Sequence, residues 1–296
     1  MPSFLKINSK KMKKIFSLAG STLAMIGIIF IAIRLHGYWR GAHLEKVHTS
    51  VWVIIILLAL CYSVINIFLA LSWRSILLHL NVEVSKAWAV RVYGISQLAK
   101  YVPGNIFHLA GRQALSMAAG LPAKKVLTSS LYEQGIIIIS GVTAGWIVLS
   151  ALAPSFPLLM GISLLIISLM ILLACLQFFL SKKMAIAGLL QITFLIFSAF
   201  IFVAILKNIT HAEYLGPDVL FYAGGTYIIA WLAGLITPGA PAGVGVRELV
   251  ILFCLSNIIP ESELLLAVVL GRVVTVIGDV IFYVYAHFIR MKQESL

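Results

Sequence analysis

Apolar residues occur along this chain in long runs that short polar segments separate. A run of about twenty apolar residues is what a helix needs to cross roughly 30 Å of hydrocarbon. The pattern therefore predicts an all-α polytopic membrane protein in which six runs form full transmembrane helices. These runs are Ile15–Ile33, Val51–Trp73, Val126–Leu152, Phe156–Leu180, Met184–Leu206 and Leu264–Ile289.

Two further apolar stretches, Trp88–Gly120 and Val219–Ile259, are interrupted by proline and glycine. These residues end helices and leave arms that barely span, so each stretch is predicted to be a broken or re-entrant helical hairpin. The chain then has eight hydrophobic regions. Non-helical backbone at membrane depth survives only against protein or a watery cavity, which makes the two breaks the first places to look for function. The break residues are Pro103, Gly104, Pro238, Gly239, Pro241, Gly243 and Gly245.

Composition excludes a water-soluble globule. Of the 296 residues, 61% are hydrophobic and only 11% are charged, with a mean hydropathy of +1.07. Soluble domains are nearer one quarter charged. The net charge of +12 does not indicate nucleic-acid binding, because the basic residues flank apolar runs instead of forming a stripe. We expect residues 1–296 to form a single integral membrane domain.

Orientation follows from the positions of lysine and arginine. If the N-terminus is cytoplasmic and each broken stretch returns to its own side, thirteen basic residues lie inside and four lie in outer loops. This distribution obeys the positive-inside rule and also makes the C-terminus cytoplasmic.

The same layout contains an internal symmetry. Residues 15–152 and 153–290 each comprise two helices, a broken hairpin and a final helix. Three crossings are odd in number, so the second half would be inverted relative to the first. Arg112 follows Pro103-Gly104 at the offset at which Arg247 follows Pro238-Gly239. Inverted repeats with broken helices at the midplane are typical of alternating-access transporters.

Arg112 and Arg247 are the leading candidates for a binding role. A charge within the bilayer costs roughly 2.5–3.5 kcal/mol at a helix centre, so it needs a partner or a task. A guanidinium facing a cavity can bind a phosphate through two hydrogen bonds. The alternative is a structural pair, in which Arg247 would cap carbonyl groups or would meet Glu248 or Glu133.

A second set of charges, Glu133, Arg272 and Asp279, is expected to couple or lock the two halves. Arg272 and Asp279 are seven residues apart and so lie on one helix face. We expect Glu133 to meet an arginine across the interface between the repeats, with Arg272 as the first choice. Lys100 and Tyr101 precede the first break and could contact a headgroup, or the lysine could extend to the inner membrane surface.

No enzyme motif is found in the sequence, and no cofactor or metal site is expected. The cysteines Cys61, Cys175 and Cys254 lack metal-ligand spacing, and no phosphate-binding loop occurs. Among the aspartates only Asp279 lies within a predicted span, so the pair that a membrane aspartyl protease needs is missing.

Two motifs carry a resemblance to a known family. The segments are Leu98-Ala99-Lys100-Tyr101-Val102-Pro103-Gly104, with Gly111-Arg112 after it, and Pro241-Ala242-Gly243-Val244-Gly245-Val246-Arg247-Glu248. Together they resemble the lysylphosphatidylglycerol synthase transmembrane-region family, whose second signature is a Pro-Gly-Gly-x-Gly-x-x-Glu turn. The similarity in pattern and length covers roughly Val51 to Ile289. Ala242 stands where that family usually has glycine.

The resemblance implies a fold like that of the membrane part of multiple peptide resistance factors, which move aminoacylated phosphatidylglycerol across the bacterial inner membrane. No aminoacyl-transferase domain follows Arg290, so lipid synthesis is not expected. The leading hypothesis is an inner-membrane flippase for a phospholipid or a polyprenyl-phosphate-linked headgroup. The alternatives are a non-catalytic partner of a lipid-linked glycosyltransferase or lipid-modifying enzyme, and an enzyme with an unrecognised site. Membrane lipids are the expected partners; a homodimer and a lipid-synthesising or glycan-assembly enzyme stay open.

Overall fold

A computed structural model describes residues 49–102, 106–153, 155–210, 212–237 and 241–289. Within these ranges all regular secondary structure is helical. The predicted helix Ile15–Ile33 lies outside the described residues, as do Pro103, Gly104, Pro238 and Gly239 of the predicted breaks.

Six segments of the described chain are long and apolar enough to cross a membrane. This is the architecture of a multi-pass helical membrane protein. The segments are α2 (Thr49–His79), α5 (Ala123–Val142) continued by α6 (Gly145–Leu152), α7 (Leu158–Cys175) continued by the π-helical turn η3 (Leu176–Leu180), α8 (Lys182–Ile209), α9 (Pro217–Ile236) and α11 (Glu261–Phe288).

Five of these segments coincide with the runs predicted from the sequence. The sixth, α9, belongs to the second interrupted stretch, and the prediction of a short arm is wrong there. Pro217 occupies the start of the helix, where its missing N–H is not needed, and the uninterrupted 20 residues of α9 rise about 30 Å.

The remaining helices are short. Two of them form a first hairpin, and another forms a second hairpin together with α9. The first hairpin contains α3 (Lys86–Gln97), the 3₁₀ turn η2 (Leu98–Tyr101) and α4 (Phe107–Ala118). The second contains α9, the 3₁₀ turn η5 (Pro241–Gly243) and α10 (Val246–Leu255); a further turn, η4 (Ala212–Tyr214), precedes it. A 12-residue arm such as α3 or α4 rises only about 18 Å, too little to cross.

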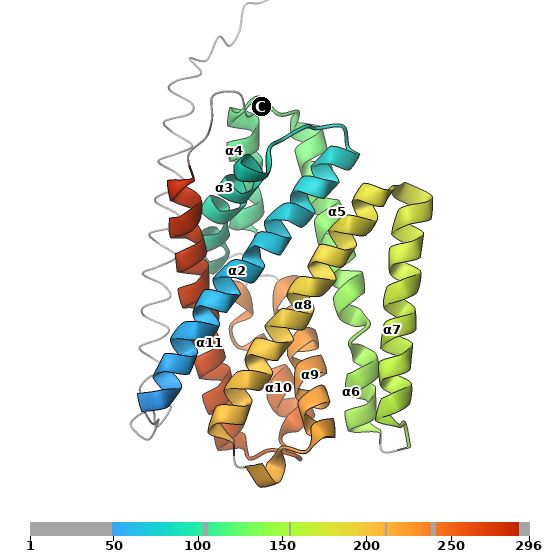
Figure 1. Ribbon diagram of the computed structural model, residues 1–296, viewed down its shortest axis with the longest axis vertical. Helices are drawn as coiled ribbons and strands as arrows, with labels where there is room; N and C mark the ends of the chain where they lie inside the picture. Colours follow the sequence, from blue (N-terminus) through green and yellow to red (C-terminus); the bar gives the residue numbers. More distant parts are fainter. Residues whose placement is uncertain (1–48, 103–105, 154, 211, 238–240, 290–296) are drawn as a thin grey trace, which may run out of the picture.

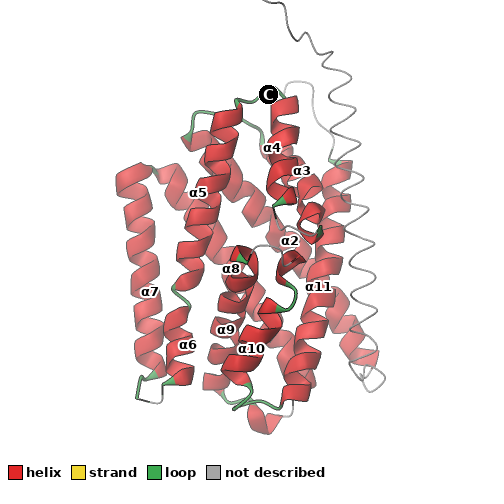
Figure 2. Ribbon diagram, turned by 180° about the vertical axis from the view of Figure 1, so that it is seen from behind, coloured by secondary structure: helices red, strands yellow, loops and turns green. Residues whose placement is uncertain are grey.

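The two hairpins occupy opposite ends of the molecule. α3 and α4 lie in the upper half of Figure 1, whereas α9 and α10 lie in the lower half, and the view from behind in Figure 2 agrees. Their breaks meet near the middle, where Leu98 and Tyr101 of η2 pack with Ala242 of η5. The turns η2 and η5, which flank the breaks, are therefore in contact inside the protein.

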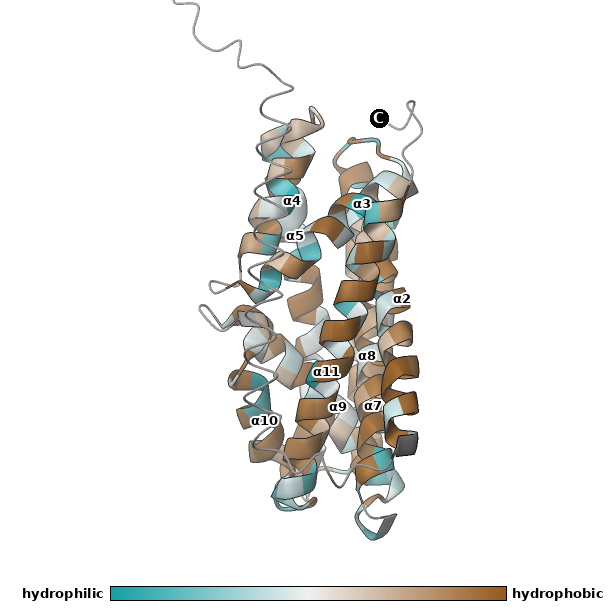
Figure 3. Ribbon diagram, turned by 90° about the vertical axis from the view of Figure 1, so that its left-hand side faces the viewer, coloured by the Kyte–Doolittle hydropathy of each residue, from teal (hydrophilic) through white to brown (hydrophobic). Residues whose placement is uncertain are grey.

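Long helices surround these breaks. α2 packs along α8 and α11, and aromatic pairs fill the interior: Phe202 stacks on Tyr227 with ring centroids 4.9 Å apart, and Trp73 stacks on Trp88 at 5.8 Å. Figure 3 shows hydrophobic residues predominating along α2 and α11, with hydrophilic segments in α3, α4 and α10. Polarity is thus concentrated in the hairpins.

α7 lies at the periphery of the bundle beside α6 (Figure 1). Gly161 is its one buried residue, and a Cβ added there would lie 2.4 Å from Ser150 Oγ, so α6 and α7 pack closely at this point. Most of the other α7 side chains are apolar, and all of them are exposed or half-buried, as expected for a lipid-facing helix. The interruption between α5 and α6 leaves an apolar groove of ≈ 540 Å³, lined by Ile138, Ile139, Val142, Thr143, Gly145, Trp146 and Leu149.

Candidate functional site: a polar chamber between two hairpins

The tip of the first hairpin is fixed to α11 by an ionic cluster. Lys100 Nζ lies 2.7 Å from Asp279 Oδ2, and the Tyr101 hydroxyl donates to the same oxygen. Asn66 of α2 donates its amide to Asp279 Oδ1 at 3.3 Å. Asp279 is fully buried, and these three donors compensate the free-energy cost of removing its carboxylate from water. The 3₁₀ turn η2 brings Lys100 and Tyr101 together at the end of the arm.

The break of the second hairpin is fixed by the same helix. Arg272 donates to the carbonyl oxygens of Ala242 at 2.7 Å and Gly243 at 2.8 Å, and its Nε lies 3.1 Å from Glu248 Oε1. Arg272 and Asp279 therefore face the same side of α11, as their spacing predicts, and each holds one hairpin.

Left-handed backbone shapes this break. Ala242, Gly243 and Gly245 have φ values of 48°, 72° and 88°. A Cβ on Gly243 would lie 2.5 Å from the Cα of Gly234 in α9, so the turn and α9 are in backbone contact. The described part of the turn includes Pro241 within η5, and Gly245 is the N-cap of α10.

The third ionic cluster joins α4 to α5. Arg112 Nη1 lies 2.7 Å from Glu133 Oε2, and both residues are only 2% exposed. Tyr93 donates its hydroxyl to Glu133 Oε1 at 2.9 Å. The Arg112 guanidinium also lies over two aromatic rings, 4.3 Å from the Tyr93 centroid and 5.1 Å from that of Trp73. This arginine is therefore buried, and its charge is paired within the protein.

The expected partner of Glu133 is therefore wrong: it meets Arg112, and Arg272 meets Glu248. Arg272 is occupied by the carbonyl groups of the second break and by Glu248. Glu133 lies on α5, which a short turn joins to α4, so its nearest arginine is Arg112. Arg112 and Arg247, expected at equivalent positions, also lie in different environments.

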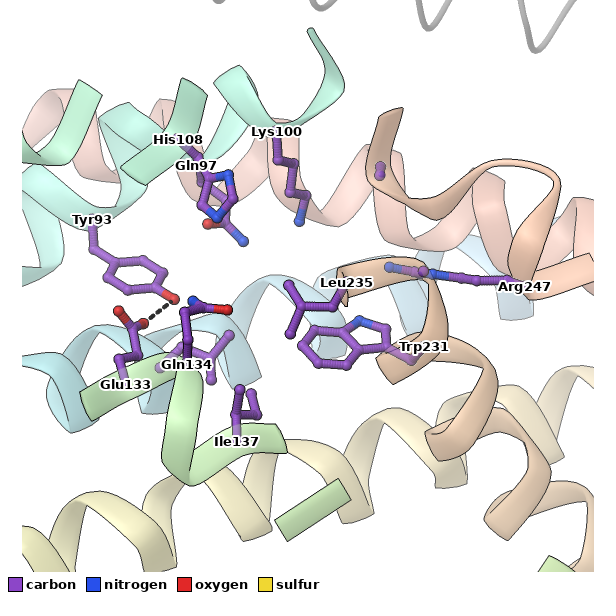
Figure 4. A pocket seen from close by; sticks show the side chains of 13 residues that line it. Tyr93, Gln97, Lys100, His108, Glu133, Gln134, Ile137, Trp231, Leu235 and Arg247 are labelled. Carbon is purple, nitrogen blue, oxygen red and sulfur yellow. Dashed lines mark hydrogen bonds between the residues drawn. The ribbon is translucent and has the colours of Figure 1, made fainter. Parts of the chain in front are cut away.

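A chamber lies between the two hairpins, with an accessible volume of ≈ 50 Å³. In Figure 4, Gln97, Lys100 and His108 point into it from the first hairpin, and Trp231, Leu235 and Arg247 from the second. Its lining consists of Leu69, Tyr93, Gln97, Lys100, His108, Glu133, Gln134, Ile137, Trp231, Gly234, Leu235, Ala242 and Arg247.

Arg247 differs from the other cations near the chamber. Like Arg112, it lies over an aromatic ring, with its guanidinium carbon 5.7 Å from the Trp231 ring centroid, and its Nε has no hydrogen-bond partner. Among the described residues no carboxylate forms an ion pair with it, whereas Lys100, Arg112 and Arg272 each have one. Arg247 also borders a smaller cavity of ≈ 20 Å³ next to Arg272. It is therefore the cation available to a ligand.

The sequence does not point to several residues of the site: the chamber residues Tyr93, Gln97, Gln134 and Trp231, and Asn66, which hydrogen-bonds Asp279. Each is a common residue inside an apolar run, but Gln97 and Gln134 are amides within membrane-embedded segments. Such residues usually face a protein interior, and this signal could have identified them.

The chamber is suited to bind an anion. It offers a guanidinium, several neutral hydrogen-bond donors and apolar walls. Among the described residues, no group of three or more histidine, cysteine or acidic side chains is placed to hold a metal ion.

Comparison with known proteins does not identify the chain. No protein-family model matches it, and no curated protein matches it in sequence.

Proposed function

We propose that this protein is a bacterial inner-membrane transporter that moves a phosphate-bearing lipid headgroup across the bilayer by alternating access. The substrate would be a phospholipid or a polyprenyl-phosphate-linked lipid. Membership of the lysylphosphatidylglycerol synthase transmembrane-region family is part of the proposal, and its support is the pair of motifs around the two breaks. Both termini would be cytoplasmic, as the distribution of basic residues favours.

The observation that carries the proposal is the environment of Arg247. An arginine without a carboxylate partner faces a polar chamber at the meeting point of two hairpins that come from opposite ends of the bundle. An unpaired charge in a membrane interior is costly, and it is retained in proteins mainly where it binds a substrate or ion. A phosphate would supply the missing negative charge and accept two hydrogen bonds from the guanidinium.

Two ion pairs support an inverted repeat of about residues 15–152 and 153–290. In the first hairpin Arg112 and Glu133 lie 10 and 11 residues on either side of Pro122. In the second, Glu248 and Arg272 each lie 12 residues from Pro260. Each pair joins the second arm of a hairpin to the helix that follows, with the charges exchanged.

The proposal divides the charged residues into two roles. Arg247 would contact the phosphate, with Lys100 and Tyr101 near the headgroup at the tip of the first hairpin. Glu133, Glu248, Arg272 and Asp279 would lock the hairpins to their neighbouring helices. Moving either hairpin requires one of these buried pairs to rearrange, and the energy of binding a headgroup could drive that change.

Reconstituted vesicles provide the test. Purified protein in liposomes with a fluorescent phosphatidylglycerol should accelerate exchange between leaflets, measured by chemical quenching of the outer leaflet. Arg247→Ala should reduce the rate at least about tenfold, the loss expected for one charge-assisted contact. Lys207→Ala, an exposed cation at the end of α8, is the matched control and should transport normally.

Other outcomes would point elsewhere. No exchange of any lipid class by the folded wild-type protein, together with stimulation of an added lipid-linked glycosyltransferase, would favour the role of a non-catalytic partner. Formation of a new lipid product by the purified chain alone would favour an enzyme. Unchanged exchange by Arg247→Ala would remove this residue from the mechanism.

A further inference from the structure

The charges around the chamber nearly cancel. Four cations and three carboxylates lie on or directly behind its wall, and each carboxylate is within 3.1 Å of a cation. The pairs are Lys100 with Asp279, Arg112 with Glu133, and Arg272 with Glu248. One positive charge, on Arg247, is left over.

The size of the chamber sets a second limit. A water molecule requires about 10–15 Å³ of the same accessible volume, so ≈ 50 Å³ holds roughly three to five water-sized groups. One phosphate group has four oxygen atoms around phosphorus and fits this space. A diphosphate has nine heavy atoms and would have to displace the side chains of the lining.

From these two observations we infer that the chamber selects lipids whose headgroup is attached through a single phosphodiester, and rejects those attached through a diphosphate. This inference rests on the proposed function and narrows its substrate class. A phosphodiester carries one negative charge, which neutralises Arg247. A diphosphate diester carries two, and its second charge would be buried without a counter-ion.

Charge alone provides useful discrimination. The second charge of a diphosphate would find no free cation, and at an effective dielectric constant of ~20 the attraction lost with one close counter-ion is enough for at least roughly tenfold selection. Neutral donors such as Gln97, Gln134 and His108 can orient the phosphate oxygens but cannot compensate a second charge. The source of the phosphodiester, a glycerolipid or a prenyl lipid, is left to the experiment.

The experiment compares matched lipids in proteoliposomes that contain the full chain. Two probes share one prenyl tail and one fluorescent sugar, joined through a phosphodiester in the first and a diphosphate in the second. Fluorescent phosphatidylglycerol is the third probe. We expect the phosphodiester probes to exchange at least about tenfold faster than the diphosphate, with the faster of the two revealing the tail that the protein accepts.

Asp279→Asn tests the charge argument directly. It keeps the side-chain shape but releases Lys100, which lines the chamber, so the surplus becomes two positive charges. The exchange rate of the phosphodiester probe divided by that of the diphosphate probe should fall at least about threefold, because the second positive charge favours the diphosphate. Asp218→Asn, at an exposed position in the first turn of α9, is the matched control and should leave the ratio unchanged.

Each result is decisive. Equal or faster exchange of the diphosphate by the wild type overturns the inference while leaving lipid transport intact. A ratio that does not move in a folded Asp279→Asn protein, verified by monodisperse gel filtration and circular dichroism, overturns it as well. If Asp279→Asn does not fold, the wild-type ratio and direct binding of the two prenyl probes in detergent decide. Exchange of no probe refutes the proposed function itself.

Discussion

The buried pair Arg112–Glu133 gives the sharpest prediction for stability. Replacing Glu133 by glutamine preserves the size of the side chain and an acceptor for the Tyr93 hydroxyl, but removes the counter-charge 2.7 Å from Arg112. Because the arginine is only 2% exposed, water cannot replace the lost carboxylate. A stranded buried charge typically costs about 3–5 kcal/mol, and we expect a loss of this size in the free energy of unfolding.

A second substitution should recover much of that loss. In the Glu133→Gln background, Arg112→Met removes the stranded charge and retains a flexible apolar side chain. The double variant should be only about 1–2 kcal/mol less stable than the wild type, with the remainder arising from the lost contacts of the guanidinium with Tyr93 and Trp73. Arg112→Met alone strands the buried Glu133 carboxylate and should also cost about 3–5 kcal/mol, so the coupling energy of the cycle should be at least about 4 kcal/mol.

Unfolding in mixed micelles by titration with sodium dodecyl sulfate, followed by tryptophan fluorescence and circular dichroism, measures these free energies. Glu213→Gln, in the exposed turn η4, is the control and should stay within about 0.5 kcal/mol of the wild type. Additive single and double effects, with a coupling energy below about 0.5 kcal/mol, would refute the assignment of this pair as a structural lock.

Four more substitutions test the second hairpin and the packing around Arg112. Gly243→Ala should destabilise the protein by about 2–5 kcal/mol, since it strains a left-handed residue and places a methyl group against Gly234. Gly245→Ala has nothing within 4 Å of the added methyl group and should cost only about 1–2 kcal/mol of backbone strain, so thermal unfolding in detergent should rank Gly243→Ala as the less stable variant. Arg272→Lys keeps the charge but cannot reach both carbonyl oxygens and Glu248 as a planar fork, so protease cleavage near the second break should accelerate at least about tenfold; an unchanged rate would contradict this clamp. Trp73→Phe removes a hydrogen bond and weakens a cation–π contact, which should reduce the free energy of unfolding by about 1–2 kcal/mol in the same detergent titration.

Hydrophobic run length predicts much of the fold because the bilayer itself sets the length of a helix. The five long segments outside the hairpins follow this rule, and proline and glycine marked both breaks. The second hairpin differs from the prediction because its first arm, α9, extends without interruption from Pro217 to Ile236. Composition could not reveal that the two arms of one hairpin differ so much in length.

The ion pairs show which part of the site the sequence could specify. Arg112 with Glu133, and Glu248 with Arg272, are each nearly symmetric about a proline in a short turn, and antiparallel helices place such residues side by side. Counting outward from Pro122 could therefore have found the partner of Glu133. The internal symmetry favours a contact across the two halves instead, and that prediction is wrong.

The pair Lys100–Asp279, in contrast, could not be predicted from local sequence spacing. Its members are 179 residues apart, and they meet because α11 passes behind the tip of the first hairpin. No local spacing encodes that contact. The isolation of Arg247 likewise emerges only when every nearby carboxylate has been assigned to another cation. These are properties of tertiary packing.

A cryo-electron microscopy map of the protein in nanodiscs with a phosphodiester lipid tests the central claim most directly. The account predicts density for the lipid phosphate in the chamber between the two hairpins, within hydrogen-bonding distance of the Arg247 guanidinium. A phosphate bound elsewhere on the protein, with Arg247 paired instead to a carboxylate and the chamber holding only water, would contradict it.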